Sequence, residues 1–166
     1  NGTVKLTTTA AGVSDLIVNV KNASTGKNDV LNLELSSAAA FAATNNKVTV
    51  ANVETININS VDTDTTAHVN DIELVAAAAK SIVVTGDTGL DFVTGTNSSA
   101  AELTNFDASA VTAGAVTFTS TNNAFAQAVT IKGATGNFVN KLTGGAGNDT
   151  LIGGAGNDTL IANNGK

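Results

Sequence analysis

Residues 144–161 read GGAGNDTLIGGAGNDTLI, which is one nine-residue unit repeated twice without change. Each copy has three glycines in its first four positions, continues with Asn-Asp and ends in Thr-Leu-Ile. Glycine permits positive φ, so such a loop turns several carbonyl oxygens toward one point, and the aspartate adds an anionic oxygen. Calcium accepts roughly six to eight oxygen ligands. The unit therefore predicts a calcium-binding turn followed by a short strand, in which Leu151 and Leu160 face inward and Thr150 and Thr159 face outward.

The perfect pair matches the nonapeptide Gly-Gly-x-Gly-x-Asp-x-apolar-x of calcium-binding β-rolls. Weaker copies of the unit lie on both sides of it. Upstream, residues 135–143 retain Gly136, Asn140 and Leu142 at the second, sixth and eighth positions, whereas downstream only Gly165 keeps its place. An isolated match at residues 86–94 has Asp87 in place of the second glycine and retains Gly86, Gly89, Asp91 and Val93. A plain Gly-Asp turn competes with a metal site there. For the tandem pair, a metal-free turn is the weaker alternative, because turn formation alone does not require the same aspartate twice.

The remainder of the chain predicts an all-β fold. Val, Ile and Thr suit the pleated surface of a strand, and Asn, Asp, Gly, Ser and Thr clusters separate short runs in which apolar and polar residues alternate. The inward positions expected from this alternation are Leu31, Leu33, Leu35, Val48, Val50, Ile56, Ile58, Ile72, Leu74, Val116, Phe118, Val129 and Ile131. We predict a β-solenoid, or parallel β-roll, because many short strands with few bulky side chains suit a narrow coil, although a β-sandwich would alternate similarly. We divide the chain into a solenoid-like domain at 1–132, with the degenerate repeat at 86–94, and calcium-binding β-roll repeats at 133–166.

Two interior features leave the local structure open. The alanine-rich runs 36–43 and 74–80 fit either a short helix or a small-residue corner of the solenoid. Only 4% of the residues are aromatic, and the six Phe are spread from Phe41 to Phe138. We therefore expect small β-branched side chains, rather than a cluster of rings, to fill the core.

Composition excludes some classes of partner. The net charge of −6, with eight scattered lysines, argues against nucleic acid, whose phosphates require clustered basic residues. No apolar run approaches the roughly 18 residues of a membrane span, so we expect no direct insertion into a membrane. The chain contains no cysteine, so redox chemistry does not indicate its compartment. It begins at Asn1 and stops inside a repeat, and we interpret it as a piece of a longer protein.

The tandem units resemble the RTX family, in which two nonapeptides complete one coil and each ion lies between a repeat and the second repeat after it. The resemblance implies a first calcium ion with ligands from two facing turns. One turn would supply the carbonyls of Gly136 and Phe138 and the amide oxygen of Asn140. The other would supply the carbonyls of Gly153 and Ala155 and the carboxylate of Asp158. A second ion would lie between the carbonyls of Gly145 and Gly147 with the carboxylate of Asp149, and the carbonyls of Ala162 and Asn164, its last ligand following Lys166. Asn140 removes one negative charge from the first site, so we expect both sites to be weaker than those of a long array.

Upstream stretches resemble RTX-type surface-layer proteins of the Caulobacter kind. The stretches are VETINI at 53–58, DTDTTAHV at 62–69, AKSIVVTG at 79–86 and FDASAV at 106–111. The resemblance implies a calcium-loaded solenoid, exported by type I secretion and assembled with copies of itself into a two-dimensional lattice on the bacterial cell surface. Millimolar calcium outside the cell would fill even weak sites and couple folding to export.

Other functions remain as alternatives. RTX repeats also occur after the catalytic domains of secreted enzymes. The sequence has a single histidine, His68, and no Gly-x-Ser-x-Gly motif. We therefore expect that the chain is not an enzyme and that His68 is exposed and non-catalytic. An RTX adhesin is harder to exclude, although a carbohydrate pocket would normally use larger aromatic rings. The irregularly clustered threonines do not favour ice binding. Asp62 and Asp64 fit a solvated turn, and a further calcium site is their alternative interpretation.

Overall fold

A computed structural model describes residues 3–8, 16–21, 23–37, 47–64, 68–92, 102–121 and 127–163. In these ranges the regular structure consists of strands. They are β1 (Thr3–Thr8), β2 (Leu16–Val18), β3 (Val30–Ser37), β4 (Lys47–Val50), β5 (Thr55–Asp62), β6 (Val69–Val75), β7 (Ser81–Gly86), β8 (Gly89–Phe92), β9 (Asn105–Val111), β10 (Val116–Thr119), β11 (Thr130–Lys132), β12 (Lys141–Thr143), β13 (Thr150–Ile152) and β14 (Thr159–Ile161). No helix that could cross a membrane occurs in the described ranges.

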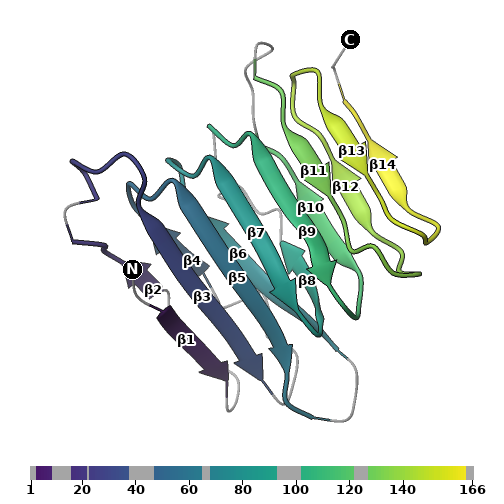
Figure 1. The fold of residues 1–166 in the computed structure, drawn as a ribbon, viewed down its shortest axis with the longest axis horizontal. Helices are drawn as coiled ribbons and strands as arrows, with labels where there is room; N and C mark the ends of the chain where they lie inside the picture. Colours follow the sequence, from purple (N-terminus) through teal and green to yellow (C-terminus); the bar gives the residue numbers. More distant parts are fainter. Residues whose placement is uncertain are drawn as a thin grey trace.

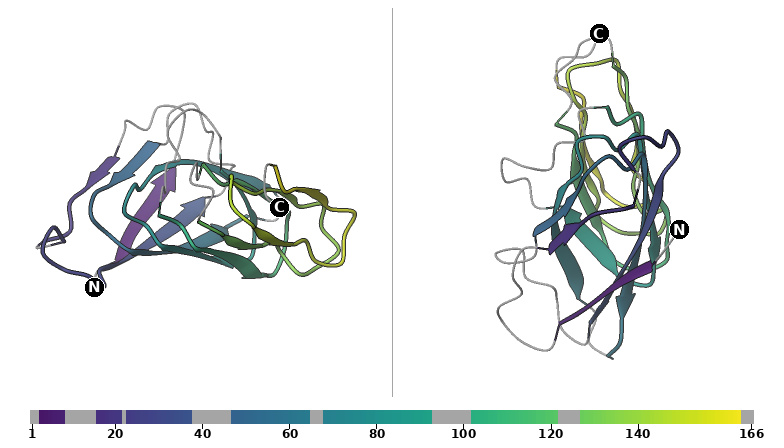
Figure 2. Two further views of the ribbon diagram at one scale, coloured as in Figure 1. Left: turned by 90° about the horizontal axis from the view of Figure 1, so that it is seen from above. Right: turned by 90° about the vertical axis from the view of Figure 1, so that its left-hand side faces the viewer.

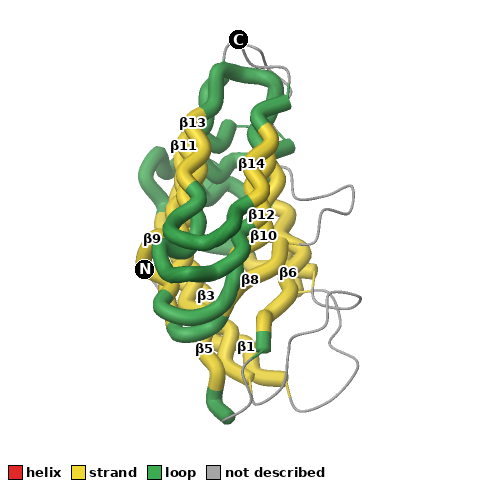
Figure 3. Tube along the Cα trace, turned by 90° about the vertical axis from the view of Figure 1, so that its right-hand side faces the viewer, coloured by secondary structure: helices red, strands yellow, loops and turns green. Residues whose placement is uncertain are grey.

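The strands form two parallel sheets that face each other across one core. The odd-numbered strands follow one another from β1 to β13 in the first sheet, and the even-numbered strands from β2 to β14 in the second. Because the chain alternates between the sheets, each pair of consecutive strands completes one coil, and the coils stack along the long axis (Figure 1). The views along and across this axis show the two layers and the loops that join them (Figures 2 and 3). The predicted β-solenoid is confirmed.

The coils shorten toward the C-terminal end. The number of residues between hydrogen-bonded residues of adjacent coils measures the coil length. It is 29 for Lys5 and Glu34 and 25 for Asp107 and Lys132, but only 18 for Asn140 and Asp158. Eighteen residues are two nonapeptides, each with a turn and a three-residue strand. The ladder of the first sheet continues from β9 through β11 to β13, so hydrogen bonds cross the expected division after residue 132.

Alternation places the apolar side chains between the sheets. All of the inward positions expected from the alternation are buried, and one continuous cluster extends from Ala23 to Leu142. Three rings lie within it: Phe92 meets Phe106 and Phe118 edge-on at 5.4 Å, and Phe106 stacks on Phe118 at 3.9 Å between centroids. The rest of the buried core is Leu, Ile, Val and Ala, so small side chains fill most of it as expected, but the contact among these three rings was not expected.

The local predictions have mixed outcomes. The alanine-rich run after Leu74 completes β6 and then turns toward β7, so it forms a corner and not a helix. Of the run at 36–43, residues 36–37 end β3 and the others lie outside the described ranges. Leu151 packs against the core as expected, but Leu160 is 46% exposed, because β14 is the edge strand of its sheet.

Candidate calcium-binding turns

Three short turns connect the last four strands. The turns at 133–140, 144–149 and 153–158 separate β11, β12, β13 and β14. Hydrogen bonds from Asn140 to Asp158 place the turn at 153–158 over the turn at 133–140. A bond from Val129 to Asp149 places the turn at 144–149 over the segment before β11. Consecutive turns therefore lie at opposite edges of the coil, and alternate turns stack.

One oxygen of the Asp149 carboxylate makes a structural hydrogen bond, and the other has no hydrogen-bond partner. Its Oδ1 accepts a 2.9 Å hydrogen bond from the Val129 N–H of the preceding coil. Its Oδ2 is buried without a hydrogen-bond partner and lies against Gly144, where a Cβ atom would overlap it. An anionic oxygen buried in this way is costly unless a cation or a donor meets it. The turn at 144–149 thus fits a bound cation.

Asp158 holds the next turn in a similar way. Its Oδ1 accepts from the backbone N–H of Asn140 at 2.8 Å, and its Oδ2 lies where a Cβ of Gly153 would stand. The first glycine of each perfect repeat, Gly144 or Gly153, is therefore needed to admit the carboxylate of the same repeat.

The other glycines permit close stacking of the coils. A Cβ on Gly147 would overlap the Gln127 carbonyl of the coil below, and a Cβ on Gly156 would overlap the Phe138 carbonyl. Positive φ, the reason for glycine offered by the sequence, applies within the perfect repeats at Gly154, where φ is 128°. Close approach of backbones, and not turn geometry, accounts for Gly147 and Gly156.

Asn140 occupies the position that corresponds to Asp149 and Asp158, and its side chain is completely buried. Its amide oxygen accepts from the N–H groups of Val116 at 3.0 Å and Ala134 at 3.2 Å. The amide nitrogen, and not the oxygen expected to bind an ion, faces the Gly153 carbonyl and the Asp158 carboxylate.

The other expected ligands have unequal positions. Gly145, Gly147 and Gly153 are buried, Gly136 and Phe138 are partly buried, and Ala155 and Ala162 are exposed. Asn164 lies outside the described ranges. The neighbouring Asn163 donates from its amide nitrogen to the Gly144 carbonyl at 2.6 Å. Calcium ligation by each of these residues stays a prediction.

Residues 131–166 match the family model of the RTX calcium-binding nonapeptide repeat, which describes four copies. These residues are an RTX calcium-binding segment. Comparison of the chain with curated proteins gave no match. Calcium is the cofactor of the RTX segment, and the buried free oxygen of Asp149 and the glycines that admit the carboxylates are the features of this chain that fit the ion.

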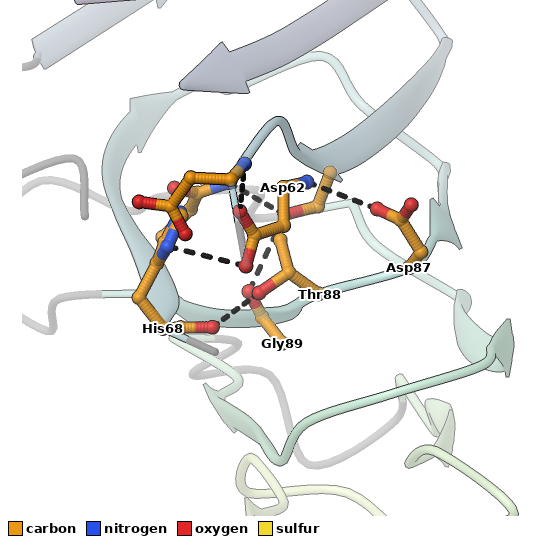
Figure 4. A network of polar contacts seen from close by, with 8 residues as sticks. Asp62, His68, Asp87, Thr88 and Gly89 are labelled. Atoms are coloured by element: carbon orange, nitrogen blue, oxygen red, sulfur yellow. Dashed lines mark hydrogen bonds and ion pairs between the residues drawn. The ribbon is translucent and has the colours of Figure 1, made fainter. Parts of the chain in front are cut away.

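Outside the RTX segment, Asp62, Asp64 and His68 lie together where β5 ends (Figure 4). One potential ligand atom from each lies within 4.8 Å of the others, and His68 Nδ1 is 3.3 Å from Asp62 Oδ2. Asp62 also receives the N–H of Asp64 on its carboxylate and donates its own N–H to Asp87 Oδ1 at 2.9 Å. The His68 side chain is 11% exposed, so the expectation of an exposed histidine was wrong. We did not predict that His68 joins Asp62 and Asp64, because His68 comes near them only when the chain passes from the end of β5 to the start of β6.

The isolated repeat match places its aspartates differently from the RTX turns. Asp91 lies inside β8, beside Asp71 of β6 in the parallel register, and not in a turn. Burial and the Asp71 carboxylate raise the pKa of Asp91 above its ordinary value, although the Lys141 cation acts in the opposite direction. Asp87 follows β7 and binds the Asp62 N–H, and Val93 lies outside the described ranges.

One carboxylate that the sequence did not single out resembles Asp149. Asp29 Oδ2 is buried without a hydrogen-bond partner and lies against Gly26, as Asp149 Oδ2 lies against Gly144. The backbone N–H of Asp29 donates to Glu54 Oε2 one coil further at 2.9 Å. The only signal in the sequence is a glycine shortly before an aspartate, which is too common to predict a site.

Proposed function

We propose that this chain is a structural piece of a bacterial surface layer, which folds and associates with copies of itself when calcium binds. The observation that carries the proposal is the continuity of the solenoid: one ladder per sheet connects the RTX turns to β1 and β2. The RTX segment thus continues the same rod and is not an appendage of a separate globular unit. A rod built from repeating coils suits lattice contacts along its length.

The charge of the chain supports a role for calcium in association. RTX repeats are typical of proteins that leave the cell by type I secretion, and extracellular calcium is abundant enough to fill weak sites. With a net charge of −6, copies of the chain repel one another, and bound calcium lowers that repulsion.

A structural role also suits the chemistry of the side chains. The single histidine of the sequence, His68, is held by Asp62, and no second histidine exists to complete a zinc-protease motif. We infer that the chain is not an enzyme.

The test is light scattering of the purified chain in EDTA, in millimolar Mg²⁺ and in millimolar Ca²⁺ at equal ionic strength. We expect large assemblies with Ca²⁺ alone, because Mg²⁺ gives the same screening but binds such flexible all-oxygen sites poorly. Electron microscopy then shows whether the assemblies are planar lattices. A monomer that persists in millimolar calcium contradicts the proposal, and a calcium-loaded monomer that binds glycans favours the adhesin instead.

Asp149→Asn is the matched variant, because an amide oxygen at this position still accepts the Val129 N–H while the charge is lost. We expect it to assemble less at each calcium concentration. Deletion of residues 144–163 removes the perfect repeats, and assembly that survives this deletion excludes the RTX turns from the contacts.

A further inference from the structure

The sixth position of each repeat in the RTX segment performs the same structural task. Asn140, Asp149 and Asp158 each use one side-chain oxygen to accept a backbone N–H one coil earlier, from Val116 at 3.0 Å, Val129 at 2.9 Å and Asn140 at 2.8 Å, respectively. In each case the donor lies at or directly before the start of a strand. Asn and Asp can both accept this hydrogen bond, because both side chains have an Oδ1 atom.

The second atom of the side chain distinguishes Asn140 from Asp149. The Asp149 Oδ2 atom is buried and has no hydrogen-bond partner, whereas the two hydrogens of Asn140 Nδ2 are shared among three oxygens within 3.0 Å. These are the Ala134 carbonyl at 3.0 Å, the Gly153 carbonyl at 2.8 Å and Asp158 Oδ1 at 2.9 Å. The reverse orientation of the amide would place its oxygen against three acceptors and its nitrogen against two N–H donors, so the orientation is fixed by the network.

We propose that the Asn140 amide takes the place of a calcium ion between the turns at 133–140 and 153–158. Two of the oxygens that it meets, the Gly153 carbonyl and the Asp158 carboxylate, are those expected to bind an ion in this gap. The neutral NH₂ group of the fully buried Asn140 hydrogen-bonds to both oxygens and adds no second negative charge to the gap. The gap is therefore closed without metal, and the calcium-dependent part of the solenoid begins at Asp149.

Asn140→Asp tests this assignment. The substitution would place a carboxylate oxygen where Nδ2 now lies, 2.8 Å from the Gly153 carbonyl and 2.9 Å from Asp158 Oδ1. Oxygens at that distance repel unless a cation or a proton lies between them. In EDTA we expect the variant to melt at least several degrees below the unsubstituted chain. In millimolar calcium we expect it to recover and to bind one more ion per chain by calorimetric titration.

Asn157→Asp is the matched control, because it adds the same charge on an exposed side chain of the facing turn at 153–158. We expect it to leave the melting temperature in EDTA and the number of bound ions unchanged. Equal melting of Asn140→Asp and the unsubstituted chain in EDTA overturns the assignment, as does an equal number of bound ions.

A measurement on the unsubstituted chain covers the case in which Asn140→Asp does not fold. The side-chain NH₂ resonances of Asn140 should be protected from exchange in EDTA and should keep their positions during a calcium titration. Fast exchange in EDTA, or a shift showing that the amide turns its oxygen to the ion, overturns the assignment. The claim that calcium dependence begins at Asp149 rests on the proposed function, but the measurements in EDTA do not. If the chain binds no calcium, the proposed function is contradicted. The measurements in EDTA still show whether the Asn140 amide closes the gap between the two turns.

Discussion

Single residues set how closely the coils stack. Gly156 lies directly over the Phe138 carbonyl, and no rotamer change relieves a Cβ that meets backbone. We expect Gly156→Ala to lower the free energy of unfolding by roughly 1–3 kcal/mol, the usual cost of overpacking. Gly136→Ala is the control, because the atoms nearest to a Cβ there belong to the partly exposed ring of Phe138, which can rotate. Urea denaturation at fixed calcium concentration measures both variants. Equal midpoints for the two would mean that the coils do not stack this closely.

Among the elements, β9 and β11 are joined by an ion pair on the outer face of the first sheet. Lys132 Nζ lies 2.8 Å from Asp107 Oδ2. Burial alone would raise the pKa of Asp107, but hydrogen bonds from Lys132 and Ser109 and the Lys132 charge outweigh it and hold the pKa below 3.8. A lowered carboxylate pKa contributes stability above the ordinary value, which is lost as the pH falls through the folded-state pKa.

Asp107→Asn should therefore melt below the unsubstituted chain near pH 6, and the difference should vanish in strong acid. Both side chains are partly exposed, at 37% and 24%, so we expect no more than about 1 kcal/mol. Thermal melts from pH 2 to pH 6 in constant calcium measure the difference. Glu102→Gln breaks the more exposed 4.0 Å pair with Lys80 and should have no effect. A difference between Asp107→Asn and the unsubstituted chain that persists at pH 2 would assign the loss to packing.

The elements also show how far sequence reasoning reaches. Alternation predicted the buried faces of strands such as β5 and β6, because a side chain changes face with each residue. It did not predict that Phe92, Phe106 and Phe118 would meet, because their meeting depends on coil length, which varies and is set by loops. The RTX turns were found because their period is constant, whereas the amide of Asn140 was expected to bind through its oxygen because the sequence does not show which acceptors surround it.

At the scale of the whole molecule, the core and the metal sites are divided along the axis. Among the described residues, the last fully buried apolar side chain is Leu142, and beyond it Ile152, Leu160 and Ile161 are 41–47% exposed. The coils after Asn140 thus bury too little apolar surface to offset the entropy of ordering their glycines. We therefore expect their order to depend on the bound ion and on hydrogen bonds such as those of Asn140 to the turn at 153–158.

Hydrogen exchange followed by mass spectrometry tests this division. Calcium at about 100 times its dissociation constant stabilises the coils that bind it by about 2.7 kcal/mol, or roughly hundredfold slower exchange. We expect this slowing at the turn 144–149, which holds the free oxygen of Asp149, and little change in β3, β5 and β7, whose side chains meet in the apolar core. The turn at 153–158 should slow less than the turn at 144–149, because its hydrogen bonds to Asn140 need no ion. Equal slowing along the whole chain would mean that calcium organises one cooperative unit, with the apolar coils unable to hold their order alone.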